Sequence, residues 1–269
     1  MKTSYPRHHI PFWKVKQTFY PAYWVCIFLW VFVTACTGVG VTADGLDGFE
    51  RRWVSSTYFD RAMGYKKSRF QVISFTEVLS QFGSGADADA VLLDCVDDYQ
   101  AIVSVTDIRQ YDLQLAMKIE LAHGSDRPVW LNPLLTVVPN GKNAPFVERF
   151  LAANISKLRF VKLANYYAPL NRAVKKGSPA SVGLKIFKDN CLFCHSIKGV
   201  GGNKGGSLPE TFDFSSQFEK QRFKDTFLLV HREDNANKQN AEQFLLPGHL
   251  DALVDFLVTA KGVVGIDGD

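Results

Sequence analysis

The longest apolar run in the chain lies near its start. Residues 22–35 carry no charge and are rich in aromatic and β-branched side chains, whereas residues 1–20 contain Lys2, Arg7, Lys14 and Lys16 and no acidic residue. A positive segment followed by an apolar one is typical of a secretory signal. The run is short for a spanning helix unless it is counted from Phe19 to Val41. Residues 1–36 are therefore expected to be a signal peptide or a membrane anchor.

The central part of the chain has the shorter apolar segments that strands favour. Strand signals occur at 86–95, 99–105, 113–120, 129–131, 134–139 and 155–163. The polar residues 96–98 predict a hairpin between the first two of these segments, and residues 105–109 and 146–151 favour short helices. This order predicts a β-rich α+β domain over residues 44–168.

Toward the C-terminus the spacing becomes helical. Leu184, Phe187 and Leu192 recur at helical intervals, and residues 249–258 form an amphipathic helix with an apolar stripe. Residues 169–179 are rich in Pro, Gly and Lys and are expected to be a linker. Helices are therefore predicted on both sides of the segment that contains the most informative motif.

Composition adds little to this picture. The 269 residues carry a net charge of +4, part of which comes from the N-terminal segment, and the remaining basic residues are scattered. No nucleic-acid binding is expected from that distribution, because a nucleic-acid interface needs basic residues clustered on one face.

The motif Cys191-Leu-Phe-Cys194-His195 is the attachment signature of a c-type haem. A C-x-x-C pair can also be half of a zinc site or a redox dithiol. The chain has no second C-x-x-C, and its other cysteines are Cys26, Cys36 and Cys95. We therefore expect one covalent haem c, with thioether bonds to Cys191 and Cys194 and with His195 as the proximal iron ligand.

Residues 178–262 resemble a class I cytochrome c domain. The resemblance rests on Gly183 and Phe187 before the motif, on Leu208 after it and on Phe256 in the last helix. It implies an all-α domain over 180–264, in which the glycine lets two helices cross closely and the two aromatic residues fill the crossing. In that family a proline carbonyl accepts the proximal imidazole N–H, and Gly206 holds its place here.

The resemblance leaves the second axial ligand open, because the family uses a methionine that follows the haem motif. The methionines of this chain are Met1, Met63 and Met117. His231 is the preferred distal ligand, and His249 is a further candidate at the start of the last helix. The alternatives are an open or weakly ligated iron and a methionine, Met117 or Met63, that reaches over from the preceding domain.

Residues 70–166 resemble the core of the sulfite-oxidase-like molybdopterin-binding fold. The resemblance rests on the segment 93–104 and on Asn132-Pro-Leu-Leu-Thr-Val-Val-Pro139. It implies that Cys95 occupies the place of a molybdenum-ligating cysteine. The surrounding arginines and long pterin-binding loops are missing, so this domain is expected to lack its cofactor and Cys95 to be a buried strand residue.

These observations predict a multidomain fold: an N-terminal signal or anchor helix, a β-rich α+β domain and an all-α cytochrome c domain. Val33-Thr-Ala-Cys36 resembles a bacterial lipobox, so the tether to the membrane is expected to be the apolar helix or a lipid on Cys36. Either tether places the rest of the chain in the bacterial periplasm, where haem c is assembled.

The expected function is electron transfer rather than catalysis, with redox proteins of the periplasm or the inner membrane as partners. One alternative is a protein that binds or senses NO or CO at an open iron site. The other is the haem subunit of a molybdopterin oxidoreductase. The second axial position decides between an electron carrier and a ligand binder.

Overall fold

The computed structural model describes residues 40–83, 87–123, 125–232 and 240–264, which belong to one compact unit that begins at Thr37. The expected signal or anchor over residues 1–36, including Cys36, lies outside the described residues. Within the described ranges, no helix is long and apolar enough to cross a membrane.

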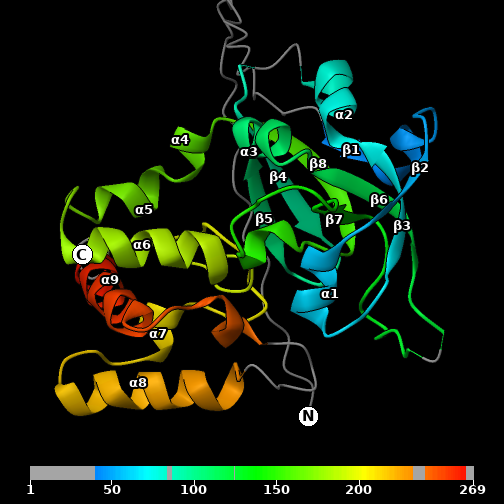
Figure 1. The fold of residues 1–269 in the computed structure, drawn as a ribbon. Helices are drawn as coiled ribbons and strands as arrows, with labels where there is room; N and C mark the ends of the chain where they lie inside the picture. Colours follow the sequence, from blue (N-terminus) through cyan, green and yellow to red (C-terminus); the bar gives the residue numbers. More distant parts are fainter. Residues whose placement is uncertain (1–39, 84–86, 124, 233–239, 265–269) are drawn as a thin grey trace, which may run out of the picture. The chain divides into compact units, whose positions relative to one another are not determined.

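Two antiparallel four-stranded sheets make up the segment 40–161, called the sheet segment below (Figure 1). The first sheet has the order β1 (Gly40–Thr42), β8 (Ile155–Val161), β4 (Ala90–Cys95), β5 (Gln100–Ser104). The second has the order β2 (Arg52–Ser55), β3 (Arg69–Ser74), β6 (Gln114–Glu120), β7 (Leu135–Val137). One apolar cluster joins both sheets and includes the fully buried Ile73, Leu93, Leu115 and Phe150.

Serine side chains start the three short helices of the sheet segment, α1 (Thr57–Met63), α2 (Phe75–Phe82) and α3 (Val105–Gln110). Ser56, Ser74 and Ser104 each accept a hydrogen bond from the backbone N–H three residues later. A serine cap satisfies an N–H group that the first helical turn leaves unpaired. Each of these helices begins within two residues of a strand end, so the caps turn the chain from a sheet into a helix.

Helices dominate residues 163–264, called the helical segment below (Figure 1). They are α4 (Leu163–Tyr166), α5 (Ala168–Arg172), α6 (Pro179–Asn190), α7 (Leu208–Thr211), α8 (Gln217–Val230) and α9 (His249–Val264). Helices α6 and α9 cross at Gly183, where any Cβ would overlap the carbonyl of Ala252. Phe187 and Phe256 fill the crossing with ring centroids 5.3 Å apart.

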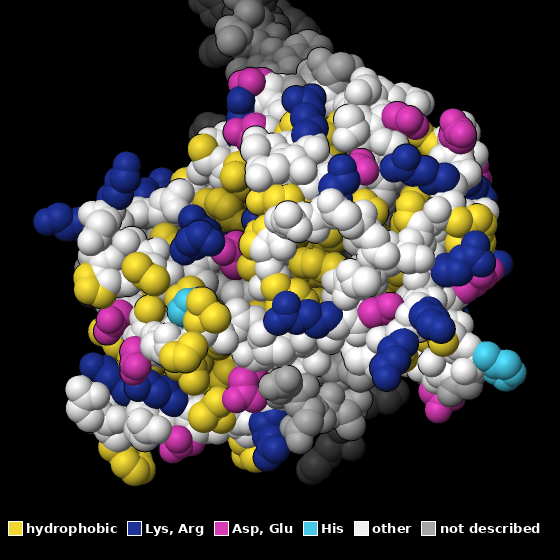
Figure 2. All heavy atoms as spheres, in the orientation of Figure 1, with side chains coloured by type: hydrophobic (Ala, Val, Ile, Leu, Met, Phe, Trp, Pro, Cys, Tyr) yellow, Lys and Arg dark blue, Asp and Glu magenta, His cyan; other side chains and the backbone are white. Residues whose placement is uncertain are grey.

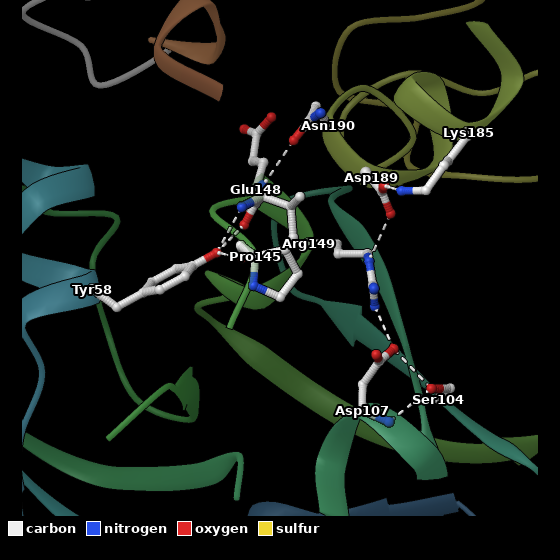
Figure 3. A network of polar contacts seen from close by, with 10 residues as sticks. Tyr58, Ser104, Asp107, Pro145, Glu148, Arg149, Lys185, Asp189 and Asn190 are labelled. Carbon is white, nitrogen blue, oxygen red and sulfur yellow. Dashed lines mark hydrogen bonds and ion pairs between the residues drawn. The ribbon is translucent and has the colours of Figure 1, made fainter. Parts of the chain in front are cut away.

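A half-buried arginine ties the two segments together (Figure 3). Arg149 is the second residue of the 3₁₀ turn η2 (Glu148–Phe150). Its Nη1 donates a hydrogen bond to Asp107 of α3 at 2.8 Å. Its Nε donates to Asp189 of α6 at 2.9 Å. Burial alone would raise the pKa of Asp107, but the hydrogen bond and charge of Arg149 outweigh it and lower that pKa.

The turn between β4 and β5 contacts the motif Cys191–His195 and the loop after it. These contacts make a second junction between the two segments. The backbone N–H of Gln100 donates to the carbonyl of Phe193 at 3.0 Å, and that of Asn203 donates to the carbonyl of Asp98 at 2.8 Å. Tyr99 stacks on Phe193 with ring centroids 4.7 Å apart. The sheet segment therefore contacts the motif directly.

The predicted fold class is wrong. Residues 40–264, as far as they are described, form one mixed α/β unit with two antiparallel sheets, and a separate all-α cytochrome c domain is not seen. The physical reason is that the helical segment buries side chains against the sheets. Phe244, from the 3₁₀ turn η3 (Ala241–Phe244), belongs to the same apolar cluster as Phe59 and Phe70 of the sheet segment.

Predictions for single elements differ in outcome. The hairpin is confirmed, because β4 and β5 pair antiparallel around residues 96–98. The strand expected at 129–131 is absent, since these described residues lie in a turn and an irregular stretch. Residues 169–179, expected to be a linker, contain most of α5, whose Leu170 is buried in the same apolar cluster as Leu184.

We predict that Gly183→Ala destabilises the protein by about 1–3 kcal/mol, because a methyl group at the crossing forces α6 away from the backbone of α9. Urea denaturation measures the change. Gly262→Ala is the matched control in α9, because a Cβ there meets no atom within 4 Å. Equal midpoints for the two variants would contradict the close crossing.

We predict that Arg149→Met lowers the free energy of unfolding by about 3 kcal/mol at neutral pH, because it leaves the partly buried carboxylates of Asp107 and Asp189 without their cation. The folded pKa of Asp107 lies below its ordinary value, so the stabilisation is present at neutral pH and is lost as the pH falls below about 4.

The matched control is Arg51→Met, which removes a solvent-exposed pair with Asp47. Such surface pairs contribute about 0–1 kcal/mol. If chemical denaturation at pH 7 gave the same small loss for both arginine variants, Arg149 would not be the tie between the segments.

Candidate haem-attachment cavity

A cavity of about 590 Å³ is lined by residues of both segments. Its size is in the range of about 300–1,000 Å³ that is usual for cofactor sites. On the face shown in Figure 2, hydrophobic side chains gather over the helices and near the centre, and charged side chains lie mostly around them. The apolar lining comes mainly from Phe59, Met63, Leu131, Leu135, Leu208, Phe223, Phe227 and Phe244.

Cys191 and Cys194 both line this cavity. Helix α6 ends at Asn190, and one more turn follows, in which the N–H groups of Cys194 and His195 donate to the carbonyl of Cys191 at 3.1 and 2.9 Å. This turn explains why both thiols reach the same cavity. Burial is the main reason why the pKa of each thiol lies well above its ordinary value.

The imidazole of His195 is oriented by the backbone. Its Nδ1 lies 3.1 Å from the carbonyl oxygen of Gly206. Because a carbonyl can only accept, Nδ1–H is the donor, and the other ring nitrogen, Nε2, is the one left to bind a metal. Burial lowers the pKa of His195 and so favours the neutral ring that metals bind.

The glycine-rich loop after the motif folds back against it. The N–H of Gly205 donates to the carbonyl of Cys194 at 2.8 Å, and that of Gly202 donates to the carbonyl of Leu192 at 2.9 Å. Any Cβ on Gly205 would overlap the ring of His195. A residue without a side chain is therefore needed for the loop to lie against the imidazole.

His231 lines the same cavity as His195 and directly follows the last residue of α8. Its backbone N–H continues the helix by donating to Phe227 at 2.8 Å. The two imidazole centroids are 6.2 Å apart, and the ring planes make an angle of 84°. Metal–imidazole bonds are about 2.0 Å long, so two rings that share one metal ion have centroids about 6 Å apart. The pair therefore fits a single iron between them.

The other candidates for a distal ligand differ in whether they line the cavity. Met63, the last residue of α1, lines the cavity, whereas Met117 packs against the core of the two sheets and is not part of the lining. His249 is the first residue of α9, and its Nδ1 accepts the backbone N–H of Leu246 at 3.2 Å. It does not line the cavity either, so His231 and Met63 are the candidates that share a wall with His195.

Cys95 lies at the end of β4 and outside the cavity lining. Its N–H donates to the carbonyl of Tyr99 at 3.1 Å. Burial, with a smaller contribution from Asp97 and Asp94, raises the pKa of its thiol to about 12. This environment keeps the thiol neutral and unreactive.

Sequence reasoning missed the contribution of the sheet segment to the cavity. Glu148, Asp97 and Tyr99 line it together with the haem motif. These residues are 40 or more positions away from the motif and show no common spacing with it, so no sequence pattern could have found them. The hydrogen bond from the N–H of Glu148 to Oδ1 of Asn190, at 3.1 Å, exists only in the folded chain.

No family model matches the chain, and no curated protein matches it. Within the described ranges there is also no group of three or more His, Cys, Asp or Glu side chains that could hold a metal ion among themselves.

Proposed function

We propose that this protein is a c-type cytochrome that carries single electrons through one haem bound covalently to Cys191 and Cys194. His195 is the proximal ligand of the iron, and His231 is the distal ligand. The observation that carries the proposal is the imidazole pair, whose ring centroids lie 6.2 Å apart in the cavity that both cysteines line. When bound, the haem supplies an iron that changes between the ferric and the ferrous state.

The chain's own residues supply attachment, ligation and an apolar shell. The carbonyl of Gly206 fixes the tautomer of His195, and Gly205 leaves room for its ring. Leu208, Phe223 and Phe227 exclude water from the helical side of the cavity. A buried iron with both axial positions filled undergoes little rearrangement when it gains or loses an electron, which suits an electron carrier.

This ligand set favours electron transfer over the alternatives. Two histidines leave no open position for CO or NO. Cys95 lies away from the cavity, which gives no support to a second redox centre in the sheet segment. Nitrogen ligands on both sides favour a lower potential than a histidine–methionine pair.

Location and partners are part of the same proposal. Covalent haem c is assembled on the periplasmic side of a bacterial membrane, and residues 1–36 supply the expected tether, either as a helix or through a lipid on Cys36. Redox proteins of the periplasm or the inner membrane are the proposed partners. Trp130 lines the cavity and is half-exposed beside the exposed Val129, which gives a partner an apolar surface close to the haem.

We predict that replacing Cys191 and Cys194 together by serine removes the haem that resists acid–acetone extraction, because no thiol is left to form a thioether bond. The measurement is the pyridine haemochrome spectrum of protein produced with a haem c maturation system. Cys95→Ser is the matched control and should keep all of its haem. Covalent haem in the double variant would refute the attachment site.

We predict that His231→Ala converts a low-spin haem into a high-spin one and gives it a CO-binding position that the unchanged protein lacks. Absorption spectra in both redox states, with and without CO, measure this change. His249→Ala controls for the loss of a histidine, and Met63→Leu tests the other candidate in the cavity wall. A low-spin His231→Ala protein, or a high-spin Met63→Leu protein, would contradict the ligand assignment.

A further inference from the structure

Glu148 places a carboxyl group on the wall of the proposed haem cavity. Its backbone N–H is held by Oδ1 of Asn190, the residue directly before Cys191. Figure 3 shows the side chain turned away from the guanidinium of Arg149, which is already paired with Asp107 and Asp189. Among the described residues, no hydrogen bond or ion pair reaches the Glu148 carboxylate.

The environment of this group is unusual for a glutamate. Burial is the only cause that shifts its pKa, and it raises that pKa to about 8. Glu148 is half-buried by surface area and is part of the cavity lining. Charged glutamates are almost never buried without a partner, because transfer of the charge out of water is costly. A carboxyl group that is neutral near neutral pH can take up and release a proton.

The neighbouring titratable groups do not neutralise this carboxylate. On the cavity wall these groups are Asp97, Tyr99, Lys204, His195 and His231. On the elements that surround Glu148 they are Tyr58 of α1, Arg149 of η2 and Lys185, Lys188 and Asp189 of α6. None of them contributes to the shift of Glu148. After burial itself, however, the charge of Glu148 is the next cause that raises the pKa of Cys191 and of Cys194. Its charge is therefore felt where the haem is attached.

We propose that Glu148 is a proton-accepting site coupled to the redox state of the haem. This inference rests on the proposed function. On reduction, one electron from an external one-electron donor converts Fe(III) to Fe(II), and one proton from water forms an O–H bond on the carboxylate. On oxidation, the electron leaves to an acceptor, the O–H bond breaks and the proton returns to solvent.

The coupling follows from Coulomb's law in a site that is poorly solvated. Ferric haem carries one more positive charge than ferrous haem, so it favours the ionised carboxylate. Loss of that charge on reduction favours the protonated form. The reduction potential must then fall as the pH rises, over the interval between the two pKa values of Glu148, and it must level off outside that interval.

The test is the midpoint potential of the full-length holoprotein, measured by optical redox titration from pH 5 to pH 9. Within this range we expect an interval in which the affinity for the electron falls by up to tenfold per pH unit, which corresponds to about 59 mV. Glu148→Gln keeps the shape of the side chain and should remove this slope. Glu77→Gln, at an exposed position of α2, should keep it.

Infrared difference spectra of the unchanged protein give a second readout that does not depend on a variant. Reduction should produce the C=O band of a protonated carboxyl group, and that band should be absent from Glu148→Gln. A pH-independent potential in a protein that holds its haem, or an equal slope in Glu148→Gln, would overturn the proton site alone. Purified protein without covalent haem would overturn the proposed function and this inference with it.

Discussion

The ion pairs of the half-buried guanidinium of Arg149 are the interaction on which the rest of the structure depends. It joins Asp107 of the sheet segment to Asp189 at the end of α6. Asp189 lies two residues before Cys191 in the chain. Two carboxylates with little access to water need a shared cation, because their charges would otherwise remain uncompensated. The haem motif is thereby held against the sheets, and the cavity acquires walls from both segments.

Local features were predictable from the sequence. The hairpin of β4 and β5, the close crossing at Gly183 and the role of the Gly206 carbonyl follow from short-range patterns and from the resemblance to cytochromes c. The separation into independent domains was wrong. Contacts such as that of Phe244 with the cluster around Phe59 join residues far apart in the chain, and no periodicity encodes them.

The same reasoning explains which site residues were found. Cys191, Cys194 and His195 form a contiguous motif, whereas His231 is one of several candidates in the sequence, and only the fold shows that its ring lies near that of His195. No sequence pattern pointed to Glu148, because its environment in the fold, not its sequence context, makes it unusual. The motif Cys191–His195 is thus combined with a sheet segment that closes the cavity and places an ionisable group in its wall.

The electron paramagnetic resonance spectrum of the oxidised holoprotein tests the central claim most directly, because it reports the axial ligands and the angle between them. An iron held by His195 and His231 with ring planes 84° apart should give a strongly anisotropic low-spin ferric signal. A high-spin ferric signal would contradict the account, since it would show that the second histidine does not bind the iron.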